Sequence, residues 1–116
     1  MSAANYDIVL DQGSNYAIDV LIKESGLVKN LTGYQARASM KTSKSATSTS
    51  ATFTCTIVNP STSGKVKMEL SSSVTAALTP GQYFYDLEIF NTGDAIVKRL
   101  IEGTVNVNAG ITVGGV

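Results

Sequence analysis

Apolar and polar residues alternate along much of the chain, and the longest alternation lies within 78–90. Successive side chains of a β-strand point to opposite faces, so this period predicts a strand with one buried face. The residues of one parity are all apolar: Tyr83, Tyr85, Leu87 and Ile89. The residues of the other parity are mixed: Phe84, Asp86, Glu88 and Phe90. We expect the first set to lie in the core.

The same two-residue period predicts further short strands on both sides of this one. They lie at 6–10, 16–23, 34–41, 52–57, 65–70 and 95–107, with turn-forming residues between them. Tyr6 is expected to share the inward face of its strand with Ile8 and Leu10. Seven to eight strands with turns about every ten residues are typical of an all-β, immunoglobulin-like antiparallel β-sandwich.

The last predicted strand is less regular than the others. Its apolar parity includes Val97, Ile101, Gly103, Val105 and Val107, but Leu100 interrupts it. Glycine within a strand is typical of a bulge or a bend, so we expect one at Gly103. Residues 91–94 are expected to form the preceding hairpin turn.

Three stretches depart from the strand period. Near 72–78 the apolar spacing becomes helical and serines precede it, which predicts one helical turn or two crossing between the sheets. The Ser/Thr-rich stretch 42–51 has almost no apolar anchor and is expected to form a mobile loop. The ends, about 1–5 and 110–116, are expected to be flexible, with Ile111 and Val113 able to complete a sheet edge.

Composition favours a single folded domain over residues 1–116. Apolar residues make up 43% of the chain, enough for an independent core. Nine basic residues balance nine acidic ones without clustering, which argues against nucleic acid as a partner. The first residues do not resemble a signal peptide, and no apolar run would span a bilayer. The single cysteine, Cys55, is expected to be a small buried hydrophobe in a protein made in a reducing cytosol.

The sequence predicts no catalytic apparatus, no metal site and no cofactor. Histidine is absent and cysteine occurs once, so catalytic triads and His/Cys zinc sites cannot form within one chain. Asp86 and Glu88 share a strand face about 7 Å apart, a spacing at which carboxylates could bind calcium or act as acid and base. Salt bridges to Arg37, Lys98 or Arg99 are the favoured interpretation, because no Asp-rich loop accompanies the two carboxylates.

Phe84 and Phe90 lie on the polar face of the same strand, where a free monomer would expose them. Either the helical turn or a loop covers these rings, or they contact another protein chain. Aromatic residues are enriched in protein interfaces, so Phe84, Asp86, Glu88 and Phe90 form a hypothetical interface patch.

The segment before this strand resembles the tyrosine corner of immunoglobulin-like sandwiches. Its hypothetical members are Leu78, Pro80, Gly81 and Tyr83. In such a corner the tyrosine hydroxyl bonds to backbone a few residues upstream, which supports folding and implies no function.

Taken together, several segments resemble a recurrent small structural protein of tailed bacteriophages. They are DIVLDQGSNY, NLTGYQARASMK, SSSVTAAL, LTPGQYFYDLEI and RLIEGTVNVNAGIT, spanning about 7–112. The chain is similar to the N-terminal immunoglobulin-like domain of phage upper baseplate proteins. Longer baseplate proteins continue beyond this domain, whereas this sequence ends directly after it, so we do not carry over the expectation of a receptor-binding or fibre-holding region.

This resemblance implies a non-enzymatic virion protein, an adaptor or connector in the tail, baseplate or neck. Its partners would be other virion proteins and copies of itself, bound through strand edges, the Phe84 and Phe90 patch and the termini. The protein would be made in the host cytoplasm and reside in the virion. No nucleic-acid, membrane or small-molecule partner is implied. Alternatives are a capsid decoration protein or a carbohydrate-binding module, although the absence of tryptophan disfavours the latter.

Overall fold

The protein is an all-β sandwich, shown as a computed structural model that describes residues 4–91 and 96–110. The strands, in chain order, are β1 (Ala4–Asn5), β2 (Ile8–Asp11), β3 (Tyr16–Leu21), β4 (Lys23–Glu24), β5 (Leu27–Val28), β6 (Tyr34–Lys41), β7 (Ala51–Ile57), β8 (Lys65–Leu70), β9 (Gly81–Asn91) and β10 (Val97–Asn108). Two short helices interrupt them, the 3₁₀ turn η1 (Ser61–Ser63) and the α-helix α1 (Ser72–Ala77). No helix in the described ranges is long and apolar enough to cross a bilayer.

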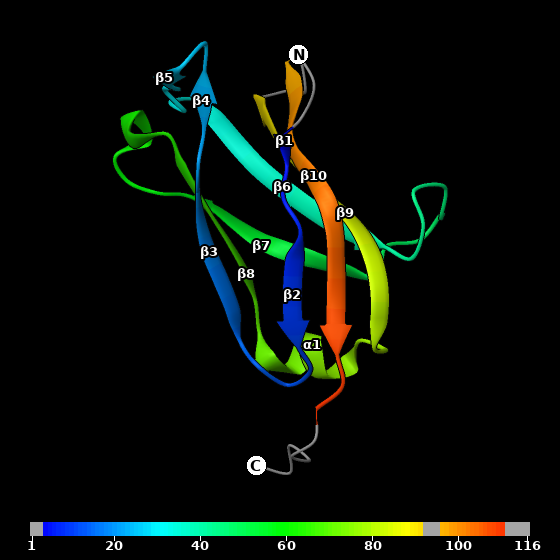
Figure 1. Cartoon of the computed structure of the whole chain (residues 1–116). Helices are drawn as coiled ribbons and strands as arrows, with labels where there is room; N and C mark the ends of the chain where they lie inside the picture. The colour runs from blue at the N-terminus through cyan, green and yellow to red at the C-terminus, as the bar shows by residue number, and fades with distance from the viewer. Residues whose placement is uncertain (1–3, 92–95, 111–116) are drawn as a thin grey trace.

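Two layers face each other, and strand β7 belongs to both (Figure 1). One layer runs from β1 and β2 through β10 and β9 to β6, and the other contains β7, β8 and β3. Residues 51–53 of β7 pair with β6, whereas residues 54–57 pair with β8. A strand that changes sheets in this way forms a corner of the sandwich, so the chain closes one side without a separate connection.

The sheet is mixed, so the prediction of a wholly antiparallel sandwich is wrong in this detail. β1 and β2 run parallel to β10, while β10–β9, β9–β6, β6–β7, β7–β8 and β8–β3 are antiparallel. Two-residue periodicity is the same in parallel and antiparallel strands. The pattern within 6–10 therefore could not reveal strand direction.

The N-terminal segment differs from the prediction in two further ways. The strand expected at 6–10 begins at Ile8, and Tyr6, which lies between β1 and β2, is 49% exposed rather than inward. Ala4 and Asn5, which belong to the predicted flexible end, pair with Ile101 and Glu102 of β10. The turn was predicted at 91–94; Asn91 ends β9, and the rest of this turn lies outside the described residues. The edge residues at 111 and 113 and most of the predicted flexible ends lie outside them as well.

The core forms where the inward faces of the two layers meet. Tyr83, Tyr85, Leu87 and Ile89 of β9 are all buried, as the alternation predicted. From the opposite layer come Val66, Met68 and Leu70 of β8, which are buried as well. The Phe53 and Tyr85 rings lie 6.0 Å apart between centroids, so aromatic packing fills the side of the core near β7.

The predicted helical segment is confirmed as α1, which carries the chain from β8 in one layer to β9 in the other. Ser71 is its N-cap, and the Val74 amide donates to the Ser71 hydroxyl oxygen at 3.4 Å. The buried Thr75 hydroxyl donates to the Ser14 carbonyl oxygen at 2.8 Å, and the Gly13 amide donates to Thr75 Oγ1 at 3.1 Å. This short helix is therefore anchored to the β2–β3 turn.

The segment after the helix has the hydrogen bond that a tyrosine corner predicts. The Tyr83 hydroxyl donates to the Thr79 carbonyl oxygen at 2.6 Å. Leu78 is buried, and Gly81 begins β9 with a φ of 145°. Because the hydroxyl spans four residues of backbone, it fixes the angle at which the chain enters β9.

The irregularity in β10 lies at Leu100 rather than at Gly103. Its register against β9 shifts between Arg99 and Ile101, and the extra residue reverses the parity of the strand. Val97 is consequently 44% exposed, although the pattern predicted it inward. Gly103 has a different role: a Cβ there would lie 2.3 Å from the Tyr6 carbonyl oxygen. Glycine is needed at this position because the N-terminal backbone crosses it closely.

Candidate protein-binding face

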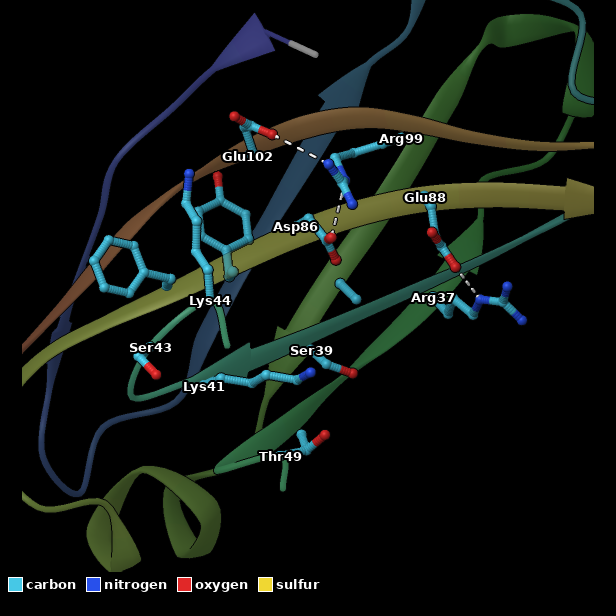
Figure 2. A pocket seen from close by; sticks show the side chains of 13 residues that line it. Arg37, Ser39, Lys41, Ser43, Lys44, Thr49, Asp86, Glu88, Arg99 and Glu102 are labelled. Atoms are coloured by element: carbon cyan, nitrogen blue, oxygen red, sulfur yellow. Dashed lines mark hydrogen bonds and ion pairs between the residues drawn. The ribbon is translucent and has the colours of Figure 1, made fainter. Parts of the chain in front are cut away.

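The outward side chains of three neighbouring strands gather on one surface, which we call the β6–β9–β10 face. Strand register decides its membership: Arg37 lies opposite Glu88, Ser39 opposite Asp86, and Lys41 opposite Phe84. Across the other side of β9, Arg99 lies opposite Glu88 and Glu102 opposite Asp86. Its members are Arg37, Ser39, Lys41, Phe84, Asp86, Glu88, Phe90, Arg99 and Glu102. Figure 2 shows most of them projecting from the three strands.

The two carboxylates of β9 are held in ion pairs by arginines from the flanking strands. Arg37 Nε contacts Glu88 Oε1, and Arg99 Nε lies 3.0 Å from Asp86 Oδ2 (Figure 2). Arg99 also reaches Glu102, at 3.6 Å. The salt-bridge interpretation of Asp86 and Glu88 is therefore confirmed. Within the described ranges, no group of three or more His, Cys, Asp or Glu side chains is arranged to hold a metal ion.

Lys98 is the third candidate partner of these carboxylates, but it pairs elsewhere. It lies opposite the buried Ile89 because it precedes the bulge at Leu100, so its side chain leaves the β6–β9–β10 face. Its Nζ lies 2.9 Å from Glu24 Oε2 on β4. Hydrogen bonding to Lys98 and the nearby lysine charges lower the pKa of Glu24, while the same carboxylate raises the pKa of Lys98.

Both phenylalanines of the face are partly exposed, and each has a cationic neighbour. The Arg37 guanidinium carbon lies 4.2 Å from the centroid of the Phe90 ring, a cation–π contact. Phe84 lies between Lys41 of β6 and Thr104 of β10 in the register. Sequence analysis left two alternatives, local cover of the rings or contact with another chain. Arg37 covers part of Phe90, but Phe84 and Phe90 both stay partly exposed, so a surface for a second chain remains.

A groove of about 450 Å³ opens on this face beside the 42–50 loop. Phe84 lines it together with Ser43, Lys44 and Thr49 from that loop. Within the described part of the chain, Lys41 and Lys44 form no ion pair, in contrast to the arginines. The groove therefore has a paired, charge-balanced end and a positive end next to an aromatic ring. The sequence singled out Phe84, but Lys44 was missed because its loop showed no pattern.

Cys55 and Tyr85 are kept in their neutral forms. Cys55 is half-buried rather than fully buried, and desolvation raises its pKa to about 11. The thiolate, which is the reactive form, is thereby disfavoured. Burial also raises the pKa of Tyr85 well above its usual value, and its hydroxyl donates to the Tyr6 carbonyl oxygen at 2.5 Å. Both groups pack against or within the core, and Tyr85 also lines the groove beside the 42–50 loop.

No family model and no curated protein matches the sequence. Among solved structures, InlP of Listeria monocytogenes aligns with a TM-score of 0.49 at 16% identity, over 91% of this chain and 28% of that one. A family 123 glycoside hydrolase from Clostridium perfringens aligns with a TM-score of 0.45 at 12% identity, over 95% and 24%.

A nucleoside hydrolase-related protein from Saccharophagus degradans aligns with a TM-score of 0.38 at 16% identity, over 92% and 23%. This chain thus spans about a quarter of the length of each of these proteins. At such scores the similarities carry no argument about activity.

Proposed function

We propose that this chain is a non-enzymatic structural protein of a tailed-phage virion, an adaptor or connector in the tail, baseplate or neck. Two kinds of observation support this proposal. The sequence segments described above resemble such proteins in their order and spacing. The β6–β9–β10 face supplies the surface through which an adaptor would bind another chain.

The observation that carries the proposal is the state of Phe84 and Phe90. Both rings remain partly exposed on a sheet face where Arg37 and Arg99 are already held in ion pairs with the β9 carboxylates. Interfaces are enriched in aromatic residues and arginine, and a side chain that is already ordered loses little entropy on binding. An aromatic pair set among fixed arginines therefore suits a flat protein contact better than free solvent.

Variant incorporation into particles tests the proposal. Particles would be assembled with either the wild-type chain or the Phe84→Ser/Phe90→Ser double variant, and the bound copies counted by quantitative mass spectrometry. Losing two interface aromatics should reduce binding affinity by about tenfold or more. The matched control is Val9→Ser/Leu27→Ser, which removes two apolar side chains that are 61% and 73% exposed elsewhere on the surface.

Two further measurements, the folding of the double variant and the position of the chain in the particle, separate the proposal from its alternatives. If the double phenylalanine variant unfolds, the rings belong to the core and the face is not an interface. Imaging of labelled particles should place the chain in the tail, baseplate or neck. Density on the shell would identify a capsid decoration protein instead, and specific glycan-array binding by the isolated chain would identify a carbohydrate-binding module.

A further inference from the structure

Strand β3 is an edge strand whose backbone groups are available on one side. Among the described residues it pairs only with β8, in antiparallel register. The Ile22 amide donates to the Gly64 carbonyl oxygen at 2.7 Å, which shows that even-numbered residues direct their backbone groups toward β8. Because this direction alternates along an antiparallel strand, the N–H and C=O groups of Ala17, Asp19 and Leu21 point to the open edge.

This edge carries none of three features that commonly prevent strand pairing between molecules, and Asp19 is its single charged residue. Natural edge strands carry proline, lysine or a bulge, whereas β3 reads YAIDVL and its register with β8 is unbroken. Its inward side chains, Tyr16, Ile18 and Val20, pack on the core but stay only half-buried. The apolar layer of the sandwich therefore continues to the edge and ends there uncovered by any described strand.

We propose that β3 pairs with β3 of a second copy of this chain, antiparallel and about a two-fold axis through Ile18. Ile18 would face Ile18 of the second copy, and Tyr16 would face Val20. On the outer side, Ala17 of each copy would exchange both backbone hydrogen bonds with Asp19 of the other. The β7–β8–β3 layers of the two copies would then form one continuous sheet.

The sequence of β3 selects this partner and this register. All three inward residues face inward residues of the second copy, so the apolar row is continuous across the axis. Each Asp19 faces an alanine and keeps Lys67 opposite it on β8 of its own chain. Sliding the strands by two residues one way would place Asp19 opposite Asp19, a like-charge pair that destabilises a sheet. Sliding by one residue would place inward side chains on the outer face.

The pairing surface is distinct from the β6–β9–β10 face, so this inference does not depend on the proposed function. An edge-to-edge contact is small and belongs to the weak end of protein interfaces. Self-association should therefore be seen at high concentration, or within an assembly that holds copies close together.

Sedimentation equilibrium of the purified chain, from about 10 μM to about 1 mM, tests the pairing. Wild-type protein should show a monomer–dimer equilibrium in this range. Ala17→Asp would place a carboxylate opposite Asp19 at two symmetric positions of the dimer and should weaken the dimer by about tenfold. Ala17→Lys would place an opposite charge at the same two positions and should tighten the dimer by about fivefold. The matched control is Thr54→Asp. It places a carboxylate opposite the same Glu69 that Ala17 faces, but on β7 away from the edge, and should leave the dimer unchanged.

Disulfide trapping checks the register independently in a Cys55→Ser background. Ile18→Cys should form a covalent dimer on mild oxidation, because residues on the axis of a non-hydrogen-bonded pair lie within disulfide reach. Val20→Cys should not, because the two copies of residue 20 would lie about 13 Å apart along the strands. Wild-type protein that stays monomeric at the highest concentration, equal effects of the two Ala17 variants, or crosslinking through residue 20 alone would overturn the proposal.

Discussion

Tyr83→Phe removes the hydroxyl of the tyrosine corner and leaves the buried ring in place. Tyr83 is 6% exposed and donates to the Thr79 carbonyl oxygen at 2.6 Å, which is a short, well-formed hydrogen bond. Thr79 is exposed, so water can replace the lost donor and no buried acceptor is left unsatisfied. The loss should therefore equal the net value of one hydrogen bond, about 1 kcal/mol of unfolding free energy.

Urea denaturation followed by circular dichroism would measure this change, and a thermal melt should shift down by about 4 °C. Tyr34→Phe is the matched control. It removes the hydroxyl of a half-buried tyrosine that makes no hydrogen bond through that group among the described residues, and should change stability by less than about 0.5 kcal/mol. Equal stability of Tyr83→Phe and the wild type would refute the idea that the corner hydrogen bond stabilises the fold.

Three further predictions concern the N-terminal crossing and the titratable groups. Gly103→Ala should cost about 2 kcal/mol in urea denaturation, because the new methyl group would displace the Tyr6 backbone. Folding raises the pKa of Tyr85 above its ordinary value of 10.0. Its contribution to the free energy of unfolding is therefore complete below pH 10.0 and is lost as the pH rises through the higher folded-state pKa. Tyr85→Phe should make alkaline unfolding less steep. Folding lowers the pKa of Glu24 below its ordinary value of 4.5. Its contribution to the free energy of unfolding is therefore complete above pH 4.5 and is lost as the pH falls through the lower folded-state pKa. Glu24→Gln should flatten this acid dependence of the melting temperature.

Each of these predictions has a contrary outcome. Unchanged stability of Gly103→Ala would mean that the N-terminal strand is not held against β10 at that point. Parallel alkaline unfolding curves for the wild type and Tyr85→Phe would show that this phenol ionises equally in both states. In acid, an equal pH dependence of the melting temperature for the wild type and Glu24→Gln would show that the Glu24–Lys98 ion pair between β4 and β10 does not stabilise the fold.

The buried face of β9 could be predicted because local sequence determines it. Tyr83 and Leu87 share a parity with only apolar residues, and burying that apolar face is favourable whichever strands cover it. The helix at 72–77 was predictable for a similar reason, since a serine cap and helical apolar spacing are local signals. Neither inference required knowledge of a neighbouring strand.

The irregular positions could not be predicted in this way. Leu100 is the extra residue of a bulge, and only the register between β9 and β10 shows that Val97 and Lys98 exchange faces there. Gly103 was correctly seen as unusual, but its cause is the Tyr6 carbonyl oxygen of a segment almost a hundred residues earlier. A contact at that sequence distance leaves no periodic trace.

The candidate binding face was likewise predictable in part. Sequence alone placed Phe84, Asp86, Glu88 and Phe90 on one side of a strand, because the side-chain period of a strand is two. Sequence alone also offered three basic partners for those carboxylates, but only the tertiary structure selected Arg37 and Arg99 and sent Lys98 to Glu24. It also left β3 as the open edge of the second layer. Periodicity fixes which way a side chain points, whereas its partners depend on strand order and register, and these are properties of the assembled sheet.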